Sequence, residues 1–383
     1  MTPFSTEALN DDDLLAGDDD GCPLAPDGRA VPTWLRAGKW RVVPLALGKA
    51  SLFPPPGGKP AEVFVEEDHL AGQGFRAPMV LLGPAGAGLT TFHRWLRLRT
   101  QRNKVRLVEL DFARIAQTDN PAEQRTRLAS SWLGRNGDHS HTDLAGLLDR
   151  LLLPESPDAP SNDRLRTHIL WRVDRLHPEN KEILLGRLRD LFERRALEGA
   201  RFAVLAHETA PLEDAEPFSS FLDVCEVYRL ADFTVADVEA MWRDWVPDRA
   251  DQAGEVAGGC IEWTGGQPVL VNLYLGRLCD TGESFDQAGQ WLLEHPPRNA
   301  LQHWQKELAR IVGESALLRR KVGNFLADEP RESVTRDELP LFLAGWIGQD
   351  ADGRWAIRSR AHASWAAGPL RSPDRYRAVG GVG

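Results

Sequence analysis

The sequence has 383 residues with a formal net charge of −10 at pH 7, and 42% of the residues are hydrophobic. This length predicts two or three domains with ordinary apolar cores. No apolar run is long enough to span a membrane, and a net negative charge does not predict bulk attraction to nucleic acid. Length, composition and charge therefore favour neither a membrane protein nor a nucleic-acid-binding protein.

The negative charge is concentrated at the start of the chain, where residues 1–32 form an acidic tail. Eight acidic residues and no Lys or Arg precede Arg29, so only two of the ten net negative charges belong to the rest of the chain. We expect this tail to be disordered and to serve solubility, with docking to a basic partner as the alternative. It has no apolar signal core, so we do not expect secretion.

The four cysteines are far apart in the sequence, at Cys22, Cys225, Cys260 and Cys279. No pair has the spacing of metal ligands, and no disulfide framework is indicated. We therefore expect reduced thiols and a cytoplasmic protein.

Residues 33–75 contain one short apolar segment, 40–47, followed by the turn-rich run Pro54 to Gly58. We interpret 33–75 as a lead-in segment rather than a domain.

Residues 76–230 alternate between the two secondary-structure patterns. Short apolar runs predict strands at 79–82, 105–110, 167–173, 202–206 and 224–230, and helical patterns lie between them at 92–102, 124–133, 144–153 and 183–197. This alternation predicts an α/β domain with a parallel sheet and helices on both faces.

Residues 231–312 show helical patterns only, at 235–245, 252–263, 269–279, 285–293 and 300–311. We expect their tryptophans to be core residues, with a partner interface as the alternative. Residues 313–370 show two helices and then two short strands around the turn Asp352-Gly353, which is the pattern of a winged helix. Residues 371–383 are expected to be a frayed tail.

The first candidate site is the stretch from Gly83 to Thr91, Gly-Pro-Ala-Gly-Ala-Gly-Leu-Thr-Thr, between a predicted strand and a predicted helix. Gly83, Gly88 and Thr90 match the phosphate-binding loop pattern G-x-x-x-x-G-K-[ST], but Leu89 stands where the lysine belongs. The backbone N–H groups of such a loop can still face an anion, and Thr90 has the position of a Mg²⁺ ligand. The alternative is a glycine-rich turn without a ligand.

The second candidate is Asp174, at the end of the apolar run 169–173. A carboxylate at the end of such a strand can hold the Mg²⁺ shell. Active ATPases of this type follow it with a Glu that polarises water, whereas here Arg175 follows, and a guanidinium cannot act as a general base. The alternative is that Asp174 only caps the strand.

Two further stretches are weaker candidates. His207 and Glu208 follow the strand 202–206 and would lie beside a γ-phosphate, although an ordinary loop explains them equally well. The run Thr264-Gly265-Gly266-Gln267-Pro268 opens a predicted helix, as glycines before a proline commonly do.

Taken in this order, these motifs resemble the AAA-like family of signal-transducing (STAND) and origin-recognition-type P-loop ATPases, over about residues 75–367. Residues 230–238 look like the start of that family's helical lid, 264–268 like its Gly-x-Pro motif, and 346–365 like the last part of its winged helix. The resemblance implies ATP or ADP with Mg²⁺ between the sheet domain and the lid. It also implies a role for each matching residue: a phosphate-lining loop of Gly83, Gly86, Gly88, Leu89, Thr90 and Thr91, metal ligands Thr90 and Asp174, and contact of Pro268 with the base.

The substitutions Leu89 and Arg175 together favour a degenerate protein that hydrolyses ATP poorly or not at all, with weak or absent nucleotide binding. Losing one strong electrostatic contact in a transition state already costs about 3–4 kcal/mol. Under this hypothesis the chain is a regulatory or scaffold component of a bacterial signalling or defence-type assembly. Its partner is then another protein, or a second copy of this chain.

Two alternatives remain open. An active ATP-dependent switch would need another cation, from Arg94, Arg97, Arg172 or a neighbouring subunit. A DNA-binding regulator would use the winged helix; its candidate cations are Arg331, Arg336, Arg354, Arg358 and Arg360, and nearby carboxylates make this the less favoured option.

Overall fold

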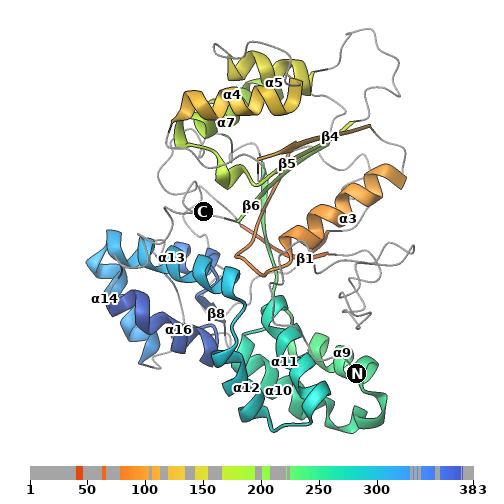
Figure 1. The fold of residues 1–383 in the computed structure, drawn as a ribbon, viewed down its shortest axis with the longest axis vertical. Coiled ribbons are helices and arrows are strands. Elements are labelled where there is room, and N and C mark those ends of the chain that lie inside the picture. Colours follow the sequence, from red (N-terminus) through yellow and green to blue (C-terminus); the bar gives the residue numbers. More distant parts are fainter. Residues whose placement is uncertain are drawn as a thin grey trace.

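The computed structural model describes residues 40–45, 63–65, 78–102, 106–112, 120–133, 143–153, 166–194, 201–207, 221, 225–327, 331, 334, 338–349, 354–371 and 373 (Figure 1). The predictions for the acidic tail, for Glu208, for Arg336 and for the end of the chain beyond 373 lie outside these residues. In the part of the chain just defined, no helix is both long enough and apolar enough to cross a membrane.

A seven-stranded sheet forms the first domain, in the order β2-β1-β7-β3-β6-β5-β4. Five of its strands are parallel: β3 (Met79–Leu82), β4 (Arg106–Asp111), β5 (Arg166–Trp171), β6 (Arg201–Ala206) and β7 (Glu226–Leu230). The central strand is β3, so the loop that follows it leaves the middle of the sheet at the carboxyl ends of the strands, where α/β folds place their ligands.

Helices cover both faces of the sheet, as the alternation of strands and helices predicts. Along β3, Met79 and Leu81 join the core under α3 (Leu89–Arg102), whereas Val80 and Leu82 join the core on the opposite face. That opposite face carries α4 (Pro121–Leu133), α5 (Leu144–Leu152) and α7 (Pro178–Glu193) (Figure 1).

The segment that we interpreted as a lead-in contributes strands to the same sheet. β1 (Trp40–Pro44) pairs antiparallel with β7, and β2 (Val63–Val65) pairs antiparallel with β1. β1 and β2 therefore extend the sheet beyond β7, and residue 76 is not where the first domain begins.

The lid is all helical, with α9 (Val235–Trp245), the 3₁₀ helix η3 (Pro247–Gln252), α10 (Ala253–Thr264), α11 (Pro268–Thr281) and α12 (Phe285–Glu294). α9 begins with a capping box between Thr234 and Asp237. The lid has its own core, in which Trp242 and Trp263 are buried.

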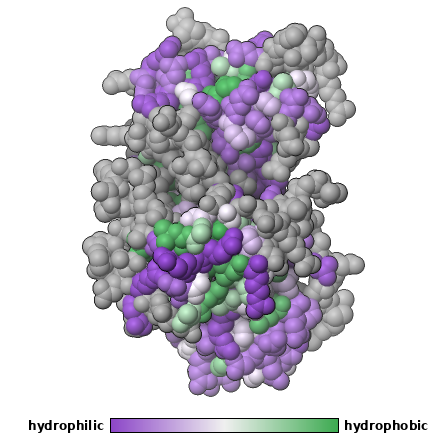
Figure 2. Space-filling view, turned by 90° about the vertical axis from the view of Figure 1, so that its left-hand side faces the viewer, coloured by the Kyte–Doolittle hydropathy of each residue, from purple (hydrophilic) through white to green (hydrophobic). Residues whose placement is uncertain are grey.

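α13 (Arg298–Glu314) is the last helix of the predicted lid and packs on the module that follows it. This last module consists of α14 (Ala316–Leu326), α15 (Leu339–Leu343), β8 (Ile347–Gln349), β9 (Trp355–Ile357) and α16 (Arg360–Arg371). β8 and β9 form an antiparallel hairpin, and a bridge from Arg331 to Trp355 adds a third strand position. This is the predicted winged helix. On its outer side hydrophobic and hydrophilic residues are mixed (Figure 2), and Leu317 of α14 is 43% exposed.

Candidate functional site

The loop after β3 has the backbone shape of an anion cradle. Gly86 and Gly88 have φ angles of +78° and +91°, which favour glycine, and Ala87 N–H donates to the Pro84 carbonyl in a turn. A Cβ at Gly88 would meet nothing within 4 Å, so the loop faces open space at that position. α3 begins directly afterwards, and the first N–H groups of a helix are available to an anion.

Leu89 belongs to the protein core. Its side chain is 1% exposed and joins the apolar cluster between the sheet and α3, together with Phe92 and Trp95. The side chain that should reach a phosphate therefore packs under the helix instead. Thr90 and Thr91 are half-buried in the first turn of α3.

The strand that was predicted to end in a carboxylate ends in an aromatic residue. β5 stops at Trp171, and Arg172 has φ 62° and ψ 45°, the one positive φ of a non-glycine residue in the described ranges. The chain then forms the 3₁₀ turn η1 (Val173–Arg175), so Asp174 lies three positions beyond the strand. The predicted extension of the strand to residue 173 is wrong, because the left-handed residue ends the extended backbone.

Asp174 is 4% exposed and is fully engaged by protein groups. Arg172 Nη2 lies 2.8 Å and Arg172 Nε 3.0 Å from Asp174 Oδ2, and His207 N–H donates to Oδ1 at 3.1 Å. Burial acts to raise the pKa of this carboxyl, but the charge and hydrogen bonds of Arg172 outweigh it and lower the pKa to about 2. A carboxylate held in this way binds a metal only if Arg172 is released.

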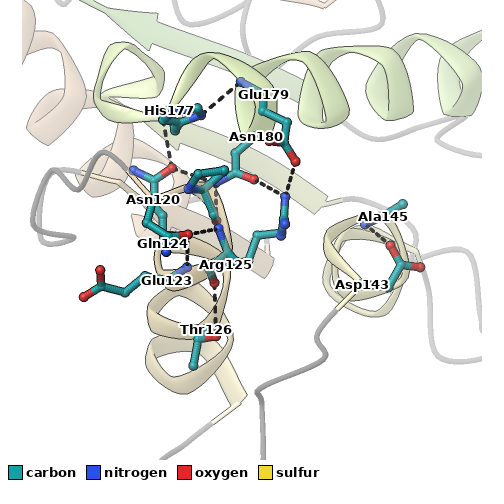
Figure 3. A network of polar contacts seen from close by, with 12 residues as sticks. Asn120, Glu123, Gln124, Arg125, Thr126, Asp143, Ala145, His177, Glu179 and Asn180 are labelled. Atoms are coloured by element: carbon teal, nitrogen blue, oxygen red, sulfur yellow. Dashed lines mark hydrogen bonds and ion pairs between the residues drawn. The ribbon is translucent and has the colours of Figure 1, made fainter.

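A polar network fixes the turn that carries Asp174 (Figure 3). Gln124 of α4 is fully buried; its Nε2 donates to the Arg175 carbonyl at 3.1 Å, and its Oε1 accepts from His177 N–H at 2.8 Å. Asn180 donates to the same Oε1 at 2.9 Å, and Arg125 donates to Asn180 Oδ1 at 3.0 Å. α4 therefore holds the C-terminal end of the turn, which limits how far it can move to admit a ligand.

His207 directly follows β6 and is 6% exposed. Its Nδ1 is 3.2 Å from the Gly83 carbonyl, and since a carbonyl only accepts, the neutral ring carries its proton on Nδ1. Burial first, and then the positive charge of Arg172, lower the pKa of His207 to about 3. His207 is therefore uncharged at neutral pH and offers no cation to a phosphate.

Aromatic rings surround this end of the sheet. Trp171 stacks on His93 of α3 at 4.5 Å between ring centroids, and its edge approaches His207 at 5.9 Å. His207 in turn lies 6.3 Å from His303 of α13. The strand ends that would face a terminal phosphate thus carry stacked rings and one internal ion pair.

The lid contacts the loop directly. Gln267 Nε2 and Trp304 Nε1 both donate to the Ala85 carbonyl, at 2.8 and 2.9 Å, and Val269 N–H donates to the Gly86 carbonyl at 3.2 Å. Gln267 lies in the candidate stretch 264–268 but was given no role of its own, and Trp304 was expected only as one of the core tryptophans of residues 231–312. Pro268 is buried at the start of α11, and its contact with a base stays a prediction.

The cations that could replace a lysine are largely engaged. Arg97 Nε is 3.0 Å from Glu109 Oε2, and Arg172 is bound to Asp174. Arg94 is half-buried on α3. Two of the three compensating arginines that we considered therefore have carboxylate partners of their own.

The winged-helix arginines are engaged too, which argues against their use on DNA. Arg360 pairs with Glu262 and Asp286 of the lid at 3.1 Å each, and its guanidinium lies 3.9 Å from the Trp263 ring. Arg331 pairs with Glu338 at 2.9 Å. Arg354 is exposed.

Arg358, the fourth of these arginines in the described residues, belongs to a buried joint between the domains. We call this group the arginine joint: Arg41 of β1, Arg229 of β7, Arg358 after β9, and the carboxylates Asp232 and Asp237. Arg358 is ion-paired with Asp232, whose other oxygen is 3.6 Å from Arg229 Nη1. Arg41 Nη2 bonds Asp237 Oδ2 and the Asp232 carbonyl at 2.5 Å each. The joint connects sheet, lid and winged helix.

Comparisons with known proteins find structures of similar fold but do not assign the chain to a family. No protein-family model and no curated protein matches the chain. Solved structures of low similarity do match. The Aeropyrum pernix ORC2 protein, solved as ADPNP–ADP complexes, is 12% identical with a TM-score of 0.39, over 77% of this chain and 88% of that one.

Two further solved structures give similar values. Cdc6p from Pyrobaculum aerophilum is 13% identical with a TM-score of 0.38, over 81% of this chain and 91% of that one. The Thermotoga maritima RuvB Holliday junction branch migration motor is 15% identical with a TM-score of 0.34, over 73% and 84%. These similarities are too low to support an argument by themselves. We describe the chain as a P-loop-type sheet domain followed by a helical lid and a winged helix because of its strand order and the order of its domains.

Proposed function

We propose that this chain is a degenerate AAA-like or STAND-like protein that does not hydrolyse ATP efficiently and acts through protein contacts. The observation that carries the proposal is the state of the strand ends: β5 ends at Trp171, and Asp174, the nearest carboxylate that follows, is ion-paired with Arg172 at 2.8 Å. The carboxylate in the position predicted to hold Mg²⁺ thus already has a cation as its partner.

The losses at this site act on the same transition state. Hydrolysis needs a cation on the terminal phosphates, a held Mg²⁺ and a base for water. Here Leu89 is in the core, Asp174 is occupied, and Arg175 follows it. Removal of one preorganised electrostatic contact lowers a rate by roughly 10²–10³, so the combined effect is expected to be severe.

Nucleotide binding is a separate question from hydrolysis. The loop keeps glycines at 86 and 88, and α3 begins at Leu89, so backbone N–H groups remain for an anion. We propose ATP or ADP with Mg²⁺ as a weakly bound or absent ligand, lined by the loop from Gly83 to Thr91.

The proposed partner is another protein, with a second copy of this chain as the next option, in a cytoplasmic signalling or defence-type assembly of a bacterium. This setting rests on the resemblance of the motifs. DNA is the less favoured partner, because Arg358 and Arg360 bond the lid-side carboxylates.

The test is ATP turnover by the purified protein with Mg²⁺, followed as phosphate release over several protein concentrations. We expect release at the level of a protein-free control, both for the native chain and for an Asp174→Ala variant. Mg²⁺-dependent turnover that rises with protein concentration and disappears in Asp174→Ala would overturn the proposal and favour an active switch.

A further inference from the structure

We propose that the lid is held closed on the P-loop by the chain's own residues, so that sheet domain and lid stay joined without bound nucleotide. The inference rests on the proposed non-hydrolysing function and adds how the domains are held together. We call the contact the latch: Gln267, Val269 and Trp304 on the lid side, with Ala85 and Gly86 on the loop side.

The Ala85 carbonyl is the centre of the latch. It accepts from Gln267 Nε2 at 2.8 Å and from Trp304 Nε1 at 2.9 Å, so both lone pairs of one oxygen are used. The two donor side chains are 0% and 1% exposed. Opening the lid would leave buried polar groups on both sides without partners until water replaced them.

The start of α11 adds a backbone contact. The first N–H groups of a helix have no partner inside the helix, and Val269 N–H uses the Gly86 carbonyl at 3.2 Å. The approach is close: a Cβ at Gly86 would lie 2.4 Å from Val269 Cγ1. Glycine at 86 therefore serves the packing of the lid as well as the shape of the loop.

The winged helix supports the latch from behind. Trp346 Nε1 donates to the Trp304 carbonyl at 3.1 Å, and the rings of Trp304 and Trp365 stack at 5.8 Å. A Cβ at Gly345 would lie 3.0 Å from Pro84 of the loop. The lid and the winged helix thus both contact the P-loop of the sheet domain.

Hydrogen–deuterium exchange of the full-length protein tests the latch, because the Val269 amide exchanges only when the lid leaves Gly86. In the nucleotide-free native protein we expect slow exchange at the start of α11, unchanged by added ATP with Mg²⁺. A Gln267→Leu/Trp304→Phe double variant removes both side-chain donors and leaves an apolar side chain at each position. We expect its exchange there to rise by roughly 5- to 100-fold, the factor that corresponds to an unpaired buried carbonyl.

Matched controls make the same substitutions elsewhere in the lid. Gln290→Leu and Trp291→Phe, both on α12, remove no contact with the loop and should change exchange at α11 by less than about twofold. The two single variants, Gln267→Leu and Trp304→Phe, each leave one donor on Ala85 and should give smaller increases. They keep the test usable if the double variant does not fold.

The inference is overturned if the start of α11 exchanges rapidly in the nucleotide-free native protein and slows when ATP is added. In that case a ligand closes the lid, while an absence of turnover would still support the proposed function. Slow, ATP-independent exchange in a protein that does hydrolyse ATP would support the latch and refute the proposed function.

Discussion

The P-loop and the arginine joint differ in how their charged side chains are used. At the P-loop the backbone geometry of an anion site is present, but Leu89 is apolar and Asp174 is neutralised by Arg172. At the joint, charged side chains are buried and ion-paired at the meeting point of three domains. Buried ion pairs therefore attach domains to one another at the joint, whereas at the P-loop a buried ion pair occupies the carboxylate that would act on a ligand.

The joint is held by a small number of carboxylates. Burial lowers the pKa of Arg229 to about 10, and burial together with the charge of Arg229 lowers that of Arg358 well below its usual value. Both guanidinium groups contact Asp232. Loss of this aspartate should therefore affect the whole joint.

The largest effect is expected for Asp232→Ala, which leaves two buried guanidinium groups without their shared carboxylate. Breaking one side of a buried ion pair costs about 3–5 kcal/mol, and we expect a loss of that size in the free energy of unfolding. Denaturant unfolding measures it. Asp248→Ala, on the exposed η3 turn, is the control and should stay within about 0.5 kcal/mol. A similar small change for Asp232→Ala would show that the joint contributes little.

A pair of glycine variants separates backbone shape from lid packing at the P-loop. Gly86→Ala and Gly88→Ala both place an L side chain at positive φ, which costs about 1 kcal/mol. Only the new Cβ at 86 would meet Val269, so overpacking should bring the total loss to about 2–3 kcal/mol. Thermal or denaturant unfolding of both variants gives the difference. Equal losses would mean that the lid does not press on the loop.

The smallest effect of a single residue is a dependence of stability on pH. Burial lowers the pKa of His207 to about 3 and also lowers those of His303 and His362, so in the folded protein they stay neutral below the unfolded value of about 6.5. The unfolded chain then binds more protons, so the free energy of unfolding should fall as the pH drops below 6.5. Each histidine contributes a slope of at most about 1.4 kcal/mol per pH unit.

His207→Gln tests this slope. Denaturant unfolding between pH 7.5 and pH 5 should show a shallower decline for the variant than for the native chain. The two proteins should differ by a constant amount above pH 7, where the histidines are neutral in both states. Identical slopes would mean that folding does not lower the pKa of His207.

Local patterns were enough to predict most elements of this fold. β3 and α9 have the predicted bounds, and α10 to α13 differ from prediction by three residues or fewer at each end, because apolar periodicity depends on neighbours in sequence. α7 begins five residues before its predicted start, at Pro178, since its first turn is polar and Pro at the first helical position was the only signal.

Non-local pairing could not be predicted in the same way. β1 pairs with β7, and no pattern in the sequence of β1 identifies its partner strand. The latch is more distant still, since Gln267 and Trp304 lie 182 and 219 positions from Ala85. Donors to a backbone carbonyl leave no motif, because any carbonyl accepts.

The backbone shape of the candidate loop could be anticipated from its glycines, whereas the side-chain arrangement around it could not, and ligand binding by the site stays a prediction. Glycine favours positive φ angles, and Gly86 and Gly88 both have them in the structure. The left-handed backbone of Arg172 could not be predicted, because arginine rarely adopts it. The predicted strand therefore extends too far towards Asp174. The sequence shows directly that position 89 has no lysine. It does not show that Leu89 is in the core, because that depends on packing against Trp95 and the sheet.

The antiparallel pairing of β1 with β7 also has a consequence for synthesis on the ribosome. Val42 pairs with Leu230, and Arg41 bonds Asp237, which is 196 positions away. At roughly 5–20 residues per second, β1 waits roughly 10–40 s for the strand and the aspartate that complete it. A nascent chain halted before residue 226 would present one side of β1 as an open strand edge, which is the kind of surface that recruits other unfinished chains.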